Sequence, residues 1–145
     1  MTRPIDTSAF HLAIAVRDLE KSCAFYQRLF AMTPTLETDD VVLLTTPARR
    51  EQLALQRKPN VTIDADTWNH HGVHFGFVVS EEVLSHSGDA IRQAGGEVVT
   101  EGSRAMGPYL FFRDPDGYLV ELFVDRGWRA GQLPVSDAGR HDTAR

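Results

Sequence analysis

The chain repeats one pattern of apolar and polar positions. Residues 10–16 (FHLAIAV) and 73–79 (VHFGFVV) each contain an apolar residue, a histidine and an apolar run, about 63 residues apart. An acidic turn and then a helical pattern follow each copy. A fixed internal period of this length defines the building unit of a fold. We therefore predict two copies of one module, each with a histidine at the same place.

The strand pattern assigns a face to each histidine. Short apolar runs bounded by polar residues favour buried strands, here over 9–16 and 72–79. Side chains alternate along a strand, so His11 and His74 face away from the large apolar residues. The packed faces hold Phe10, Leu12, Ile14 and Val16, and then Val73, Phe75, Phe77 and Val79. Small residues on the histidine faces leave room around the imidazoles: Ala13, Ala15 and Gly76.

An amphipathic helix follows each of these strands, over roughly 18–31 and 81–95. Asp18 is a candidate N-cap for the first helix, and Gly95 ends the second. Helical spacing predicts the inward stripes. These are Leu19, Ser22, Cys23, Tyr26, Leu29 and Phe30 in the first helix, and Val83, Leu84, Ser87, Ala90, Ile91 and Ala94 in the second.

Three further strands complete each module. The pattern predicts them at 35–38, 41–45 and 52–56, and then near 97–100, 108–113 and 118–124. Asp114-Pro115-Asp116-Gly117 is a strong turn signal between the last two strands.

Each module is therefore predicted to have the element order βαβββ, and the predicted fold class is α+β. Module one spans about 8–58 and module two about 71–126, and both belong to one domain, 1–126. We expect the two paired modules to form a curved mixed sheet with a concave cavity. Residues 127–145 form a polar C-terminal tail.

The concave face collects residues with metal-binding chemistry: His11, Gln56, His74 and Glu121. Glu121 lies in an apolar strand, where an unpaired carboxylate would cost several kcal/mol to bury. Two imidazoles and one carboxylate suit a divalent metal with open coordination positions: iron(II), manganese, zinc or nickel. Against this, a single histidine on a strand is usually an ordinary core or surface residue. His71 is a reserve ligand, while His70, His86 and His141 are expected at the surface.

Composition limits the alternatives. The 145 residues are 42% hydrophobic and 24% charged, as in ordinary globular domains. The formal charge of −5 comes with no basic stripe, so the charge pattern typical of nucleic-acid binding is absent. No apolar run has the length of a membrane span, and the N-terminus lacks a secretory signal. The single cysteine, Cys23, excludes an internal disulfide, so we expect a cytoplasmic protein.

At these residues the sequence resembles the vicinal oxygen chelate superfamily, which includes glyoxalases, extradiol dioxygenases, fosfomycin-inactivating thiol transferases and bleomycin-resistance proteins. The resemblance lies in residues 10–30, 72–96 and 109–123, and its most specific part is the turn at 114–117 before a strand glutamate. It implies paired βαβββ modules and commonly a homodimer. It also implies metal ligands that match His11, His74 and Glu121.

Several positions depart from the patterns of individual activities. Bacterial-type glyoxalases have a second glutamate where this chain has Gln56, and a neutral amide cannot act as their base. Extradiol dioxygenases and fosfomycin enzymes have a tyrosine where this chain has Phe111, although Tyr109 lies one step earlier on the same face. The acid–base histidine of ring-cleaving enzymes has no equivalent near residue 104. Bleomycin-resistance proteins generally lack the metal ligands, which argues against simple drug sequestration.

The sequence thus predicts a metal-dependent enzyme whose small substrate chelates a divalent metal through two oxygens. Dioxygenase, thiol transferase and lyase chemistry all stay open, with a slight preference for the first two. Gln56 and Tyr109 are expected to contact the substrate. The main alternative is a metal-free protein of the same fold that binds or sequesters a small molecule. A third possibility is an inactive relative with a structural metal.

Overall fold

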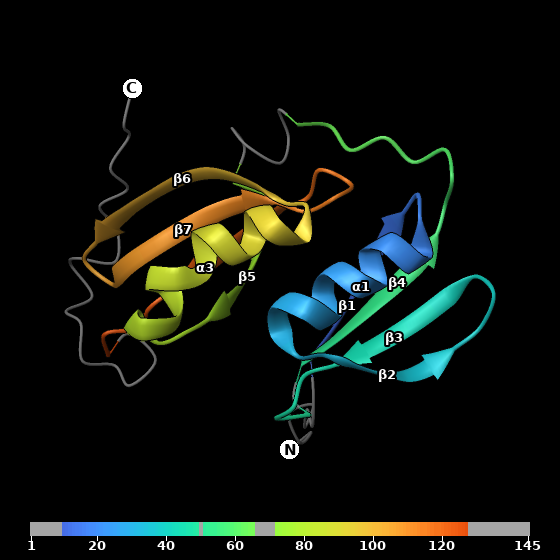
Figure 1. The fold of residues 1–145 in the computed structure, drawn as a ribbon, viewed down its shortest axis with the longest axis horizontal. Helices are drawn as coiled ribbons and strands as arrows, with labels where there is room; N and C mark the ends of the chain where they lie inside the picture. Colours follow the sequence, from blue (N-terminus) through green and yellow to red (C-terminus); the bar gives the residue numbers. More distant parts are fainter. Residues whose placement is uncertain (1–9, 50, 66–71, 128–145) are drawn as a thin grey trace, which may run out of the picture. The chain divides into compact units, whose positions relative to one another are not determined.

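The computed structural model describes residues 10–49, 51–65 and 72–127. The chain divides into two compact units (Figure 1). The first unit consists of Met1–Asp64 together with the turn Asp114–Gly117. The second consists of Ala65–Arg113 and Tyr118–Arg145. In the described part of the chain, no helix is long and apolar enough to span a membrane.

The first unit contains one helix and a four-stranded sheet. Its elements are β1 (Phe10–Val16), α1 (Leu19–Phe30), β2 (Thr33–Glu37), β3 (Val41–Thr45) and β4 (Glu51–Arg57). The strand order is β1-β4-β3-β2, with β1 parallel to β4 and the other pairs antiparallel. A parallel pair requires a crossover, and the chain between β1 and β4 supplies it.

The second unit repeats this topology. Its elements are β5 (Phe75–Val78), α3 (Glu81–Ala94), β6 (Glu97–Arg104), β7 (Gly107–Arg113) and β8 (Leu119–Phe123). The order is β5-β8-β7-β6, again with the first pair parallel. The predicted α+β class and the two βαβββ modules are thereby confirmed. Their union into one curved sheet around a shared cavity stays a prediction.

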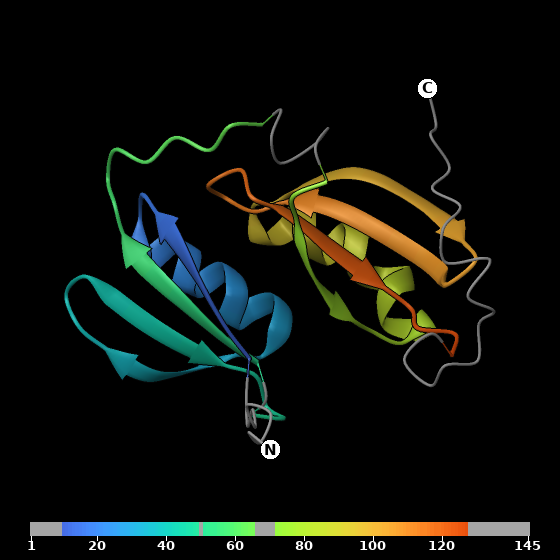
Figure 2. The same cartoon turned by 180° about the vertical axis from the view of Figure 1, so that it is seen from behind.

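The helix of each unit covers one face of its sheet (Figure 1). Figure 2 shows the opposite faces, over which no helix of the described residues lies. The helix caps follow the sequence: the Asp18 side chain accepts a hydrogen bond from the backbone N–H of Lys21, and Gly95 adopts a left-handed conformation after α3. Glycine takes this conformation without the steric cost of a Cβ atom.

The predicted inward stripes need correction. In α1, Phe25 is buried although it was not assigned to the stripe, whereas Cys23 is only half-buried. In α3, Ser87 and Ile91 are buried, but Val83 is 52% exposed and Ala90 is also exposed. Helical periodicity identifies a face of the helix, but it does not show where the sheet beneath that face ends.

The edge strands also differ from prediction. Phe10 is 66% exposed at the start of β1, and Val73 is 43% exposed and precedes β5. Both strands form the edge of their sheet, and β5 begins only at Phe75 because its ladder with β8 covers four residue pairs. In contrast, β6 continues to Arg104, since its backbone pairs with β7 as far as Gly107.

Candidate metal centre

Glu121 is a buried carboxylate on the helix-free face of the second sheet. Its neighbours Val120 and Leu122 point to the other face and are almost fully buried. Glu121 itself is 5% exposed, and its strand neighbours are Phe111 on β7 and Gly76 on β5. A carboxylate buried to this extent requires partners, as the sequence predicts.

The first partner is His74, immediately before β5. Its Nε2 lies 3.1 Å from Oε2 of Glu121, within hydrogen-bond distance. The imidazole also contacts Phe111 edge to face, with ring centroids 5.1 Å apart. His74 and Glu121 therefore lie close together, as predicted, and the Phe111 ring packs against the imidazole.

The second partner, Arg104, was missed from the sequence. Its Nη2 donates a hydrogen bond to Oε1 of Glu121, so both carboxylate oxygens are engaged. The guanidinium also lies over the Tyr109 ring, 4.8 Å from its centroid. The predicted strand ended near residue 100, and only its continuation to Arg104 places this side chain on the face of Glu121.

Burial and charge set the protonation of this cluster. Burial lowers the pKa of His74, and the Arg104 charge acts in the same direction, while a backbone hydrogen bond with Gly72 opposes them. Burial also lowers the pKa of Arg104, opposed by Tyr109, but an arginine keeps its proton in proteins. The lowered pKa favours the neutral imidazole, the form that binds metals, next to a cationic guanidinium.

Gly76 sets the distance between β5 and β8 at the carboxylate. A Cβ atom at this position would lie 2.7 Å from the backbone oxygen of Glu121 and 3.0 Å from its Cβ. The sequence predicted that this small residue leaves room around the imidazole, which stays a prediction. The structure adds a second reason for glycine, because the missing side chain allows the Glu121 backbone to approach.

His11 and Gln56 lie in the first unit. His11 is paired with Gln52, and Gln56 with Ala15, so both belong to one face of the β1–β4 pair, and both are exposed. Within the described residues, no group of three or more His, Cys, Asp or Glu side chains is arranged to hold a metal ion. The convergence of His11 with His74 and Glu121 therefore stays a prediction.

Other predicted residues occupy separate places. His86 is exposed on α3, as expected. His70, His71, His141 and the tail beyond residue 127 lie outside the described residues. Tyr109 lines a hollow of about 550 Å³ with residues of α3, β6 and β7, and neither His74 nor Glu121 lines it.

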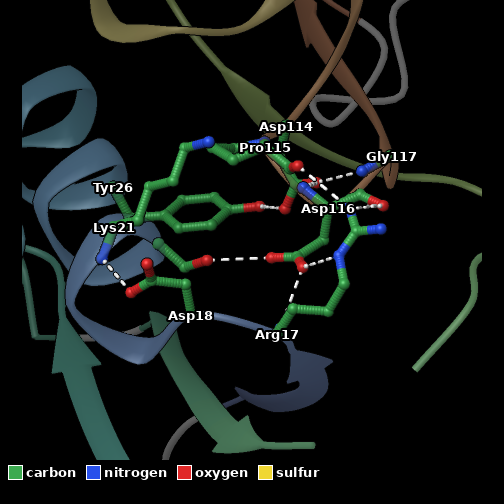
Figure 3. A network of polar contacts seen from close by, with 9 residues as sticks. Arg17, Asp18, Lys21, Tyr26, Asp114, Pro115, Asp116 and Gly117 are labelled. Atoms are coloured by element: carbon green, nitrogen blue, oxygen red, sulfur yellow. Dashed lines mark hydrogen bonds and ion pairs between the residues drawn. The ribbon is translucent and has the colours of Figure 1, made fainter. Parts of the chain in front are cut away.

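The turn Asp114–Gly117 binds the first helix. Tyr26 Oη donates a 2.6 Å hydrogen bond to Asp114, and Ser22 Oγ donates a 2.8 Å bond to Asp116 (Figure 3). The backbone N–H and the Nε of Arg17 also donate to Asp116, at 2.9 and 3.2 Å. The sequence predicted this turn but not its partners. The turn is thus part of the first unit although it connects two strands of the second sheet.

Comparison with known proteins identifies relatives. Residues 8–122 match the sequence model of the Glyoxalase/Bleomycin resistance protein/Dioxygenase superfamily. Metallothiol transferase FosB of Shouchella clausii is 26% identical over 115 residues, 77% of this chain and 76% of FosB. Catechol-2,3-dioxygenase of Bacillus subtilis is 25% identical over 121 residues, which is 83% of this chain but only 42% of the dioxygenase.

A solved structure supports the fold assignment. A mutant of the fosfomycin resistance protein FosX from Listeria monocytogenes superimposes with a TM-score of 0.70 at 18% identity. The match covers 87% of this chain and 98% of FosX, which was crystallised with Mn(II) and 1S,2S-dihydroxypropylphosphonic acid. At this identity the similarity establishes the fold alone.

Proposed function

Because the chain belongs to the Glyoxalase/Bleomycin resistance protein/Dioxygenase superfamily, we propose that it is a divalent-metal-dependent enzyme acting on a small substrate that chelates the metal through two oxygens. His11, His74 and Glu121 would hold the metal, which would be iron(II), manganese, zinc or nickel. The observation that carries this proposal is the buried Glu121 carboxylate with His74 Nε2 at 3.1 Å.

The residues of the second unit fit such a metal in their chemistry. Glu121 offers a carboxylate, and His74 offers an imidazole whose pKa is lowered by burial and by the Arg104 charge. The hydrogen bond between His74 and the Gly72 backbone resembles the contacts that orient metal-ligating histidines. When bound, a divalent metal supplies positive charge that stabilises negative charge developing on a substrate oxygen.

The third ligand, His11, comes from the first unit. It stands at the position of β1 that the repeat makes equivalent to His74. The three ligands would come either from one chain or from two copies in a homodimer, the assembly expected from the sequence. On the same proposal, Gln56 and Tyr109 contact the substrate, Gln56 through its amide and Tyr109 through its phenol.

Among the reaction types, thiol transfer ranks first. The match to the metallothiol transferase FosB covers about three quarters of both chains, whereas the match to the dioxygenase covers less than half of that protein. Gln56 also weighs against glyoxalase-like lyase chemistry, because an amide cannot act as a base.

The second candidate is a metal-free protein that binds a small molecule. Arg104 favours this candidate, because its guanidinium already balances the Glu121 charge that a metal would otherwise balance. On this reading the polar cluster would hold the sheet face together without turnover.

Elemental analysis separates the two candidates. Protein purified anaerobically without chelator should contain one divalent metal ion for each site formed by His11, His74 and Glu121. His74→Ala should lose both this metal and activity in a panel of fosfomycin with thiols, catechols and hemithioacetals. His86→Ala is the matched control, because this exposed histidine lies on α3 away from the carboxylate. A metal content unchanged by His74→Ala would rule the proposal out.

A further inference from the structure

Arg104 is hydrogen-bonded to one oxygen of Glu121, the carboxylate that would bind the proposed metal. It donates to Oε1 of Glu121, while His74 lies against Oε2. A divalent cation at this carboxylate would stand next to the guanidinium, and like charges a few ångströms apart in a buried site repel strongly. Metal binding and the Arg104–Glu121 pair are therefore alternatives.

Tyr109 provides a second holding point for Arg104. The guanidinium lies 4.8 Å from the Tyr109 ring centroid, within the range of a cation–π interaction. The phenol in turn lies across Gly102, where a Cβ atom would be 2.8 Å from Tyr109 Oη. Gly102 thus allows the ring position that keeps Arg104 at the site when Glu121 no longer binds it.

The released guanidinium needs a new partner. The Arg104 side chain is 36% exposed, so its donors can reach a bound molecule, whereas Glu121 is buried below it. Guanidinium donors match oxyanions such as carboxylate, phosphate and phosphonate. We propose that Arg104 exchanges Glu121 for an oxyanion group of the substrate when the metal binds, so that it selects anionic substrates; this rests on the metal site proposed above.

This exchange couples two binding events. The metal removes Glu121 from Arg104 and so strengthens oxyanion binding. By linkage the oxyanion strengthens metal binding by the same factor, and such couplings typically amount to about 5–150-fold. The coupling runs entirely through Arg104 and disappears when its charge is removed.

Calorimetric titration with Mn(II) tests the coupling, using wild type, Arg104→Met and the control Arg92→Met. Arg92 is an exposed arginine paired with Asp89 on α3. At constant ionic strength, replacing chloride by sulfate should tighten Mn(II) binding about fivefold or more in wild type and in Arg92→Met. Arg104→Met should bind Mn(II) more tightly than wild type in chloride and show no sulfate effect. Equal Mn(II) affinities, or a sulfate effect retained in Arg104→Met, would overturn the inference.

A metal-free measurement separates this inference from the metal proposal. Glu121→Gln removes the charge that holds Arg104, so this variant should bind sulfate about fivefold or more tightly than wild type without metal. The gain should vanish in the double variant Glu121→Gln/Arg104→Met, as followed by NMR titration. If wild type binds no metal but this gain appears, only the metal proposal fails. If metal binds but the gain is absent, only the role of Arg104 fails.

Discussion

The phenol of Tyr26 donates a 2.6 Å hydrogen bond to Oδ2 of Asp114, and both residues are buried. The two residues lie 88 positions apart in the sequence. Asp114 also accepts hydrogen bonds from the backbone N–H groups of Asp116 and Gly117 through its Oδ1, at 3.0 and 2.9 Å. One carboxylate therefore shapes the turn and joins it to α1.

Removing this phenol should destabilise the protein. Tyr26→Phe removes a short hydrogen bond to a buried carboxylate, which costs about 1–3 kcal/mol in free energy of unfolding. Urea denaturation measures the change. The control Ser85→Ala removes an exposed hydroxyl bound to the Glu82 backbone and should change the free energy by less than about 0.5 kcal/mol. Equal effects of the two substitutions would show that the Tyr26–Asp114 bond does not stabilise the turn.

Gly76 should be required for the position of Glu121. Gly76→Ala places a Cβ atom 2.7 Å from the Glu121 backbone oxygen, so β5 or β8 must move. We expect a loss of about 1–3 kcal/mol in unfolding free energy and weaker Mn(II) binding. Gly88→Ala is the control, because its Cβ would lie 3.4 Å from the flexible end of the Arg92 side chain and 3.9 Å from Leu110 Cδ1, an ordinary contact, and alanine favours a helix. Retained metal affinity in Gly76→Ala would contradict this role.

Cys23 should be a poorly reactive thiol. Burial raises its pKa above the ordinary value of 9.0, and the negative charge of Glu37 adds to the effect. The folded state disfavours the Cys23 thiolate, so the protonated thiol contributes to the free energy of unfolding. This contribution is fully present below pH 9.0, and it is lost as the pH rises through the higher pKa of the folded state. The rate of alkylation against pH should therefore have its midpoint above 9.0 in folded protein and near 9.0 in urea. Identical midpoints would disprove the shift.

Two residues of the candidate metal centre could be predicted from the sequence. Alternation along two strands placed His74 and Glu121 on one face, because a period of two fixes which side chains share a side. The apolar neighbours of Glu121 also indicated that this carboxylate would be buried and paired. Both inferences depend only on local pattern and on the order of the strands.

The contacts of Arg104 and of the turn at 114–117 depend on tertiary pairing, which no local sequence pattern predicts. Residues 101–104 (EGSR) are polar, so hydrophobic periodicity ends before Arg104 although the backbone ladder continues. The turn at 114–117 is evident from its composition, but its partners Ser22 and Tyr26 lie more than 80 residues away. Side chains that hydrogen-bond across such separations are identified by the packed structure alone.

The central claim is that His11, His74 and Glu121 bind one metal ion, and counting the imidazoles around that ion tests it most directly. X-ray absorption spectra of zinc-loaded wild type and of His86→Ala should show two imidazole ligands. The spectra of His11→Ala and of His74→Ala should each show one. A zinc shell that is unchanged when His11 is replaced would contradict the claim.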